Sequence, residues 1–107
     1  MTEAQFQKKV TDFLTRQSVY YVKVWGGGFQ RAGIPDLLCN VNGFFVAVEL
    51  KTEVGRTSKL QDYNIERIRE SGGVAIVLRP SWFENFKIFV KEVMKLPCPK
   101  LNFPIPE

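Results

Sequence analysis

The sequence predicts a single α/β domain with a mixed four-stranded sheet flanked by helices, in the order αβββαβα. Residues 2–17 and 58–71 carry apolar side chains at helical spacing, and each segment opens with Ser or Thr followed three residues later by Gln, the capping-box pattern. The dipeptide Asn42-Gly43 separates two strand-like runs, as in a tight β-hairpin. Residues 74–78 are continuously apolar, which is typical of a buried strand in parallel pairing.

The other strands follow from local composition. β-Branched and aromatic residues at 19–25 predict the first strand, which a run of three glycines ends. Residues 36–41 and 44–51 are the arms of the hairpin, so these two strands are expected to be antiparallel neighbours. Both alternating faces of the second arm begin apolar, which places this arm at the centre of the sheet. Strand 74–78 is expected to follow it through a right-handed crossover.

The domain is expected to cover residues 1–96, followed by a proline-rich tail at 97–107. Ser81 and Glu84 predict a third capping box, which would open the last helix of the domain. That helix carries an apolar stripe and is expected to end before the tail.

Composition narrows the possible functions. The sequence contains no histidine, which excludes His-based zinc sites and Ser-His or Cys-His catalysis, so any catalysis would use carboxylates, lysine and a bound metal. A net charge of +4 and a pI near 9.2 fit a polyanionic partner, although so mild an excess is common in other proteins. No membrane span or secretory signal is recognised, so a cytoplasmic location is expected, and Cys39 and Cys98 are expected to be free and without function.

Two acids and a lysine form the strongest candidate site. Asp36 opens one arm of the hairpin, and Glu49 and Lys51 lie at the end of the other arm on one face, so the register brings them together. Neighbouring carboxylates repel unless a cation lies between them, and oxygen ligands suit Mg²⁺ or Mn²⁺. The alternative interpretation of a Glu-x-Lys pattern such as Glu49 and Lys51 is a pair of solvated residues at a strand end or a simple ion pair.

These residues resemble the VRR-NUC (virus-type replication-repair nuclease) family of the PD-(D/E)XK nuclease superfamily. The resemblance covers residues 1 to 80 and is carried by GIPDLL at 33–38, VELK at 48–51, Ser58 with Gln61, and the helix end at 72–73. It implies a restriction-endonuclease-like αβββαβ core that hydrolyses DNA with Mg²⁺ or Mn²⁺ and no small-molecule cofactor. A viral member would act in the host cytoplasm.

The resemblance also implies roles for individual residues. Asp36 and Glu49 would bind metal, Lys51 would be the catalytic lysine, and Glu3 would be an additional acidic ligand. Leu50 fills the variable place of the motif and is counted with the metal-binding set. The alternative for Glu3 is an acid in the first helical turn, favoured there by the helix dipole.

Gln61 lies on the apolar stripe of its helix, so its amide needs a partner on the sheet side. The functional interpretation is a catalytic role, with a hydrogen bond to a metal-bound water or to Lys51. The alternative is a glutamine that only caps its own helix.

Two segments are candidate DNA contacts. Gln30 and Arg31 lie in a glycine-rich loop that could approach a phosphate, although such loops are often only mobile connections. Arg56, Ser58 and Lys59 lie at a predicted helix N-terminus, which attracts phosphate through its dipole and its free N–H groups.

We expect a DNA endonuclease acting on branched DNA as a homodimer, because symmetric cutting of two strands needs two sites. The family resemblance also implies a dimer similar to Holliday-junction resolvases. Flap or single-strand cleavage, or a non-catalytic nucleic-acid-binding module, are the alternatives. The candidate dimer surface is the aromatic last helix with the tail, whose alternative is packing on its own sheet. Its residues are Trp82, Phe83, Phe86 and Phe89.

Overall fold

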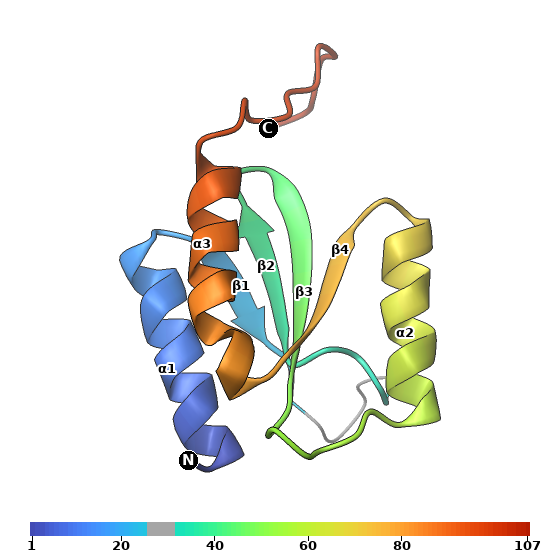
Figure 1. The fold of residues 1–107 in the computed structure, drawn as a ribbon. Helices are drawn as coiled ribbons and strands as arrows, with labels where there is room; N and C mark the ends of the chain where they lie inside the picture. Colours follow the sequence, from blue (N-terminus) through green and yellow to red (C-terminus); the bar gives the residue numbers. More distant parts are fainter. Residues whose placement is uncertain (26–31) are drawn as a thin grey trace.

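A mixed four-stranded sheet forms the centre of the computed structural model, which describes residues 1–25 and 32–107 (Figure 1). Its strands are β1 (Tyr20–Lys23), β2 (Leu37–Val41), β3 (Phe44–Leu50) and β4 (Val74–Leu78), in that spatial order. β1 pairs with β2 and β2 with β3 in antiparallel fashion, whereas β3 and β4 are parallel. The predicted fold class and the central place of the third strand are confirmed.

Helices cover both faces of this sheet. α1 (Glu3–Arg16) and α3 (Phe83–Met94) lie on one face, and α2 (Lys59–Glu70) lies on the other (Figure 1). The main core fills the space between α1, α3 and the sheet, where aromatic rings meet edge to face. No helix of the described residues has the length and apolar character needed to cross a membrane.

The helix starts differ in how well the sequence predicts them. The capping boxes of α1, with Thr2 and Gln5, and of α2, with Ser58 and Gln61, are confirmed. The predicted box at the start of α3 is wrong. A short 3₁₀ helix, η1 (Pro80–Trp82), precedes α3, and Ser81 donates both its backbone N–H and its hydroxyl to the carboxylate of Glu53 instead. A distant loop thus takes the hydroxyl that would have capped the helix.

The hairpin forms where the sequence predicts it. Asn42 and Gly43 have φ values of 52° and 89°, the positive values that this tight turn requires. The Asn42 amide also donates to the carbonyls of Val93 and Leu96, at 3.0 and 2.8 Å, and so ties the turn to the end of α3. Beyond this point residues 97–107 form no helix or strand and extend away from the sheet (Figure 1).

The aromatic last helix does not present the predicted dimer surface. Phe83 and Phe86 are only 7% and 0% exposed because they pack into the core beside α1. Phe89 is partly buried against the same core, and only Trp82 has substantial exposure, at 40%. For Phe83, Phe86 and Phe89 the alternative, a helix packed on its own sheet, is therefore correct, whereas the tail, the other part of the predicted surface, is exposed and stays a prediction.

The two cysteines are free, as predicted. Cys39 lies inside β2, where burial raises the pKa of its thiol to about 12, so it stays protonated and inert. Cys98 is exposed in the tail.

The loop that leads into β2 packs closely on α2. Gly33 has a φ of +84°, and a Cβ added there would lie 2.8 Å from the backbone carbonyl carbon of Leu60. Only glycine combines this conformation with so close an approach. The contact fixes the short segment between Gly33 and Asp36.

Gly33→Ala therefore destabilises the protein by at least about 2 kcal/mol, since the new methyl group forces loop and helix apart. Gly72→Ala is the matched control, because Gly72 has a similar φ of +97° but open space around its Cβ position, and it costs about 1 kcal/mol from backbone strain alone. Urea unfolding measures both. Equal losses of unfolding free energy in the two variants would show that the close contact between Gly33 and α2 does not contribute to stability.

Candidate active site

Asp36 and Glu49 face one another across the hairpin. Leu37 pairs with Val48 in the antiparallel register, and one further step along both strands sets Asp36 opposite Glu49. Asp36 precedes β2 by one residue, and its Oδ2 accepts a hydrogen bond of 2.7 Å from the backbone N–H of Leu50. This bond holds one carboxylate against the strand that carries the other.

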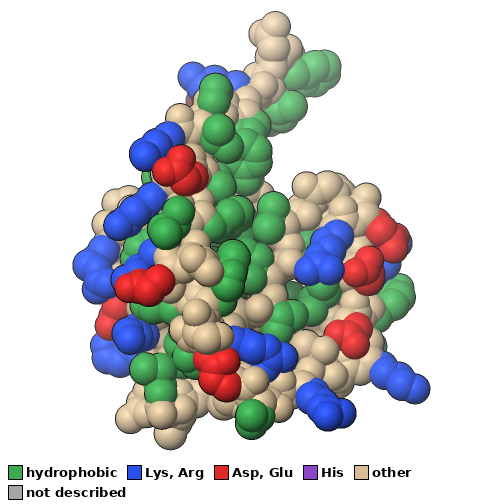
Figure 2. All heavy atoms as spheres, viewed as in Figure 1, with side chains coloured by type: hydrophobic (Ala, Val, Ile, Leu, Met, Phe, Trp, Pro, Cys, Tyr) green, Lys and Arg blue, Asp and Glu red, His purple; other side chains and the backbone are tan. Residues whose placement is uncertain are grey.

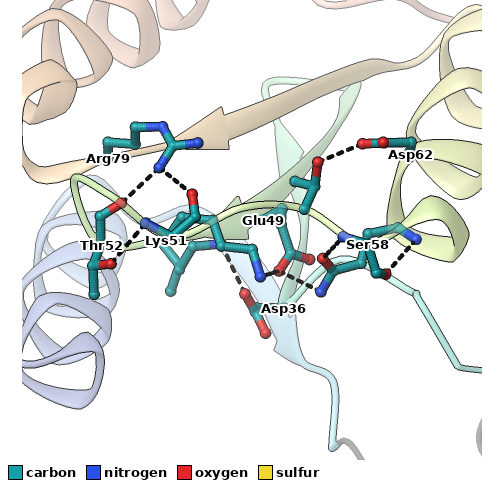
Figure 3. Close-up of polar contacts among 11 residues, drawn as sticks. Asp36, Glu49, Lys51, Thr52, Ser58, Asp62 and Arg79 are labelled. Carbon is teal, nitrogen blue, oxygen red and sulfur yellow. Dashed lines mark hydrogen bonds and ion pairs between the residues drawn. The ribbon is translucent and has the colours of Figure 1, made fainter.

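Glu49 is the most unusual residue of the site. It is only 2% exposed, in a strand whose neighbouring side chains are all apolar. Its Oε2 accepts a hydrogen bond of 3.0 Å from Nε2 of Gln61 and lies 3.6 Å from Nζ of Lys51 (Figure 3). Its Oε1 is buried with no hydrogen-bond partner among the described residues. Such an atom loses its hydration without compensation.

The surroundings of Glu49 disfavour its ionised form. Burial, and then the negative charge of Asp36, raise the pKa of Glu49 from its ordinary 4.5 to about 7, while Lys51 opposes the shift. Glu3 adds a smaller contribution in the same upward direction. A group that must lose a proton in this environment needs a cation close to it.

Lys51 supplies a positive charge beside the Glu49 carboxylate. Its side chain is only 15% exposed and leaves the end of β3 toward Glu49 (Figure 3). Figure 3 also shows Asp36 beside these two groups, with all three side chains converging at one end of the sheet. The structure thus brings together the three residues that the sequence singles out.

Gln61 caps its own helix, which is the alternative interpretation from the sequence, and it also contacts a site residue. Its Oε1 accepts from the backbone N–H of Ser58 as part of the capping box, while its Nε2 donates to Glu49. Lys51, the protein partner expected from the sequence, is not the one that it contacts. The amide therefore links the start of α2 to the buried carboxylate.

Arg79 is a residue of this region that sequence reasoning missed. Its Nη1 donates to the carbonyls of Thr52 and Gly55, at 2.7 and 2.6 Å, and so shapes the loop that follows Lys51 (Figure 3). The signal was present in the sequence, because Arg79 directly follows a strand predicted to lie parallel to the strand of Lys51. Parallel neighbours end at the same edge of a sheet.

The other predicted metal ligands are placed less directly. Glu3 is exposed in the first turn of α1, near enough to act on Glu49 by its charge. The described residues contain no group of three acidic, cysteine or histidine side chains arranged to hold a metal ion. Leu50 has a fully buried apolar side chain, so only its carbonyl oxygen could be a ligand. Asp36 and Glu49, with the unpartnered oxygen of Glu49, fit a hard divalent cation.

The predicted DNA contacts fall into two groups. Gln30 and Arg31 lie outside the described residues. Arg56, Ser58 and Lys59 are exposed beside the N-terminus of α2, and the Ser58 hydroxyl accepts from the N–H of Gln61 as the helix cap. Figure 2 shows Lys and Arg side chains standing out from the surface at the lower right, where α2 begins.

A comparison with solved structures finds the same fold in a VRR_NUC domain protein. The two structures superpose with a TM-score of 0.73 over 91% of each chain, with 20% identical residues. No family model and no curated protein matches the sequence. At this identity the likeness shows the fold alone, and it confirms the fold that the sequence resemblance implied.

The raised pKa of Glu49 predicts a pH dependence of the metal-free protein. The folded state holds a proton on Glu49 more tightly than the unfolded state, so this stabilisation is present below about pH 4.5 and is lost as the pH rises through about 7. The free energy of unfolding is expected to fall by an amount on the order of 2 to 3 kcal/mol. Thermal unfolding in EDTA between pH 5 and 8 measures it.

Glu49→Gln removes this pH-dependent part of the free energy of unfolding because glutamine does not titrate. Glu84→Gln is the control, since Glu84 is exposed and the hydrogen bond from Lys87 lowers the pKa of its carboxyl, so its titration lies below the measured window. Identical pH profiles for wild type and Glu49→Gln would refute the proposed burial cost of the ionised carboxylate.

Proposed function

We propose that this protein is a metal-dependent nuclease that hydrolyses phosphodiester bonds in DNA, with Mg²⁺ or Mn²⁺ as the bound ion. The observation that carries the proposal is Glu49, buried to 2% exposure with one carboxylate oxygen unpartnered, beside Asp36 and Lys51. A protein that used these groups only for stability would have little reason to bury a carboxylate without a full set of partners.

The carboxylates of Asp36 and Glu49 are the groups that would hold the ion. A divalent ion supplies stabilisation of the negative charge that develops on the phosphate, and it lowers the pKa of a water molecule, which replaces the missing histidine base. Glu3 would contribute as a further acid from α1. The Leu50 carbonyl is the one atom of that residue suited to the same role.

Lys51 acts on the substrate side of the site. Its ammonium group lies 3.6 Å from Glu49 and is partly accessible, so it can both orient an attacking water and offset the charge of a phosphate oxygen. Gln61 would position the Glu49 carboxylate through the hydrogen bond from its amide to Oε2. Arg79 positions the loop after Lys51 and does not itself contact these acids.

The fold supports this reading independently of the site geometry. The similar structure is named a VRR_NUC domain protein, and the same αβββαβ arrangement presents the three candidate residues at one end of the sheet. The positive net charge of +4 and the exposed Arg56 and Lys59 at the start of α2 fit a phosphate backbone near that end.

Branched DNA cut by a homodimer is the form of this activity that we propose. A single small domain offers little surface for a junction, and symmetric cuts in two strands require two sites related by a twofold axis. Light scattering after size-exclusion chromatography tests the assembly. A monomer at micromolar concentration that cuts flaps but not four-way junctions would replace this form with the flap-nuclease alternative.

Cleavage tests the catalytic set. Wild-type protein cuts labelled DNA with Mg²⁺ or Mn²⁺ and not in EDTA, whereas Asp36→Asn and Glu49→Gln lose cleavage, and Lys51→Met loses roughly 100-fold or more in rate. Asp12→Asn is the matched control, because Asp12 is an exposed acid paired with Lys8 on α1.

Metal binding is read separately from activity. Mg²⁺ or Mn²⁺ raises the Tm of wild type and of Asp12→Asn but not that of Asp36→Asn or Glu49→Gln, because only an ion that binds the folded state stabilises it. Cutting without metal would defeat the proposed mechanism. So would a metal-induced rise in Tm that is as large in the two site variants as in wild type.

A further inference from the structure

A cleft lies beside the candidate active site, between α1 and the end of β1. It has a volume of about 190 Å³ and is lined by Gln7, Lys23, Val24 and Trp25. The volume is below the range of about 300 to 1,000 Å³ typical of sites for whole small molecules. The cleft is therefore of a size for one flat group rather than for a complete cofactor.

The backbone connects this cleft directly to the catalytic carboxylates. The N–H of Val24, a lining residue of the cleft, donates to the carbonyl of Asp36 at 2.8 Å, so these two residues lie side by side just beyond the paired ends of β1 and β2. Glu49 lies one strand further, and neighbouring strands are about 4.8 Å apart. On the other wall, Gln7 follows Glu3 by one helical turn and lies on the same side of α1.

The lining has the chemistry of a nucleotide site. Trp25 is 76% exposed, a large indole face that the core does not use. Lys23 is exposed and forms no ion pair with any other residue of the described chain. The Gln7 amide offers both a donor and an acceptor. Indole faces stack on nucleobases without strong sequence preference, and lysine contacts phosphate as a point charge.

We propose that this cleft binds a nucleotide next to the scissile phosphate, with its base stacked on Trp25 and its phosphate held by Lys23. The proposal rests on the proposed nuclease function and names its substrate class. A base can stack on an indole only after it has left the duplex stack. The enzyme therefore selects DNA that has an unpaired nucleotide beside the cut, as at a flap or an opened branch point.

Fluorescence tests the stacking directly. The chain contains two tryptophans, so Trp82→Phe leaves Trp25 as the only indole, and Asp36→Asn in the same protein blocks cleavage. Titration with a short single-stranded oligonucleotide quenches Trp25, whereas an intact duplex of the same sequence, at the same ionic strength, produces little quenching.

Kinetics tests the role in substrate selection. On a flap substrate, Trp25→Ala raises KM about 10-fold or more with little change in kcat, and Trp25→Phe restores most of the loss because it keeps a stacking ring. Lys23→Ala raises KM about 3- to 10-fold and makes the salt dependence shallower. Lys91→Ala, which removes an exposed lysine of α3, is the control for loss of charge and leaves KM unchanged.

The outcomes separate this inference from the nuclease proposal. Two results would reject nucleotide binding in the cleft and leave the nuclease function intact. One is metal-dependent cleavage with unchanged KM in Trp25→Ala and Lys23→Ala, and the other is equal quenching by duplex and single strand. Quenching by single strands without any cleavage by wild type would support the cleft and reject catalysis. Absence of both binding and cleavage would reject both.

Discussion

The buried carboxylate of Glu49 is the constraint around which the site is built. The residue continues a strand that is apolar and covered on both sides, so its charge has no access to bulk water. One oxygen accepts a hydrogen bond from Gln61 and lies near Lys51, while the other has no hydrogen-bond partner among residues 1–25 and 32–107. Asp36 lies opposite with a second negative charge. Such an arrangement is unfavourable as it stands, and the cation that we propose between the two acids would offset their repulsion.

The fold supplies this arrangement through a few local devices. The Asn42-Gly43 turn fixes the register that sets the two acids at the same level. The helix cap at the start of α2 shares its glutamine with Glu49, so helix formation and orientation of the carboxylate depend on one side chain. Arg79 holds the loop between β3 and α2 by donating hydrogen bonds to the carbonyls of that loop. These contacts hold the strand end that carries Glu49 and Lys51 to α2 and to the loop that precedes it.

Sequence patterns predict local and register-dependent features well, and long-range side-chain partners poorly. The hairpin turn and the alternation of the strands were enough to bring Asp36 and Glu49 together, because register follows from a tight turn by counting. The partner of Ser81 could not be foreseen, since it depends on how a distant loop is packed. The burial of Phe83 and Phe86 likewise follows from tertiary packing, because an apolar stripe looks the same whether it meets its own sheet or another protein.

The most direct test of the central claim is a crystal structure of the protein grown with Mn²⁺ and located by anomalous scattering. The proposal predicts an Mn²⁺ ion held by the carboxylates of Asp36 and Glu49, with the Gln61 hydrogen bond to Oε2 of Glu49 retained. Anomalous peaks only elsewhere on the molecule, or no metal at Asp36 and Glu49 in crystals with saturating Mn²⁺ above pH 8, would contradict it.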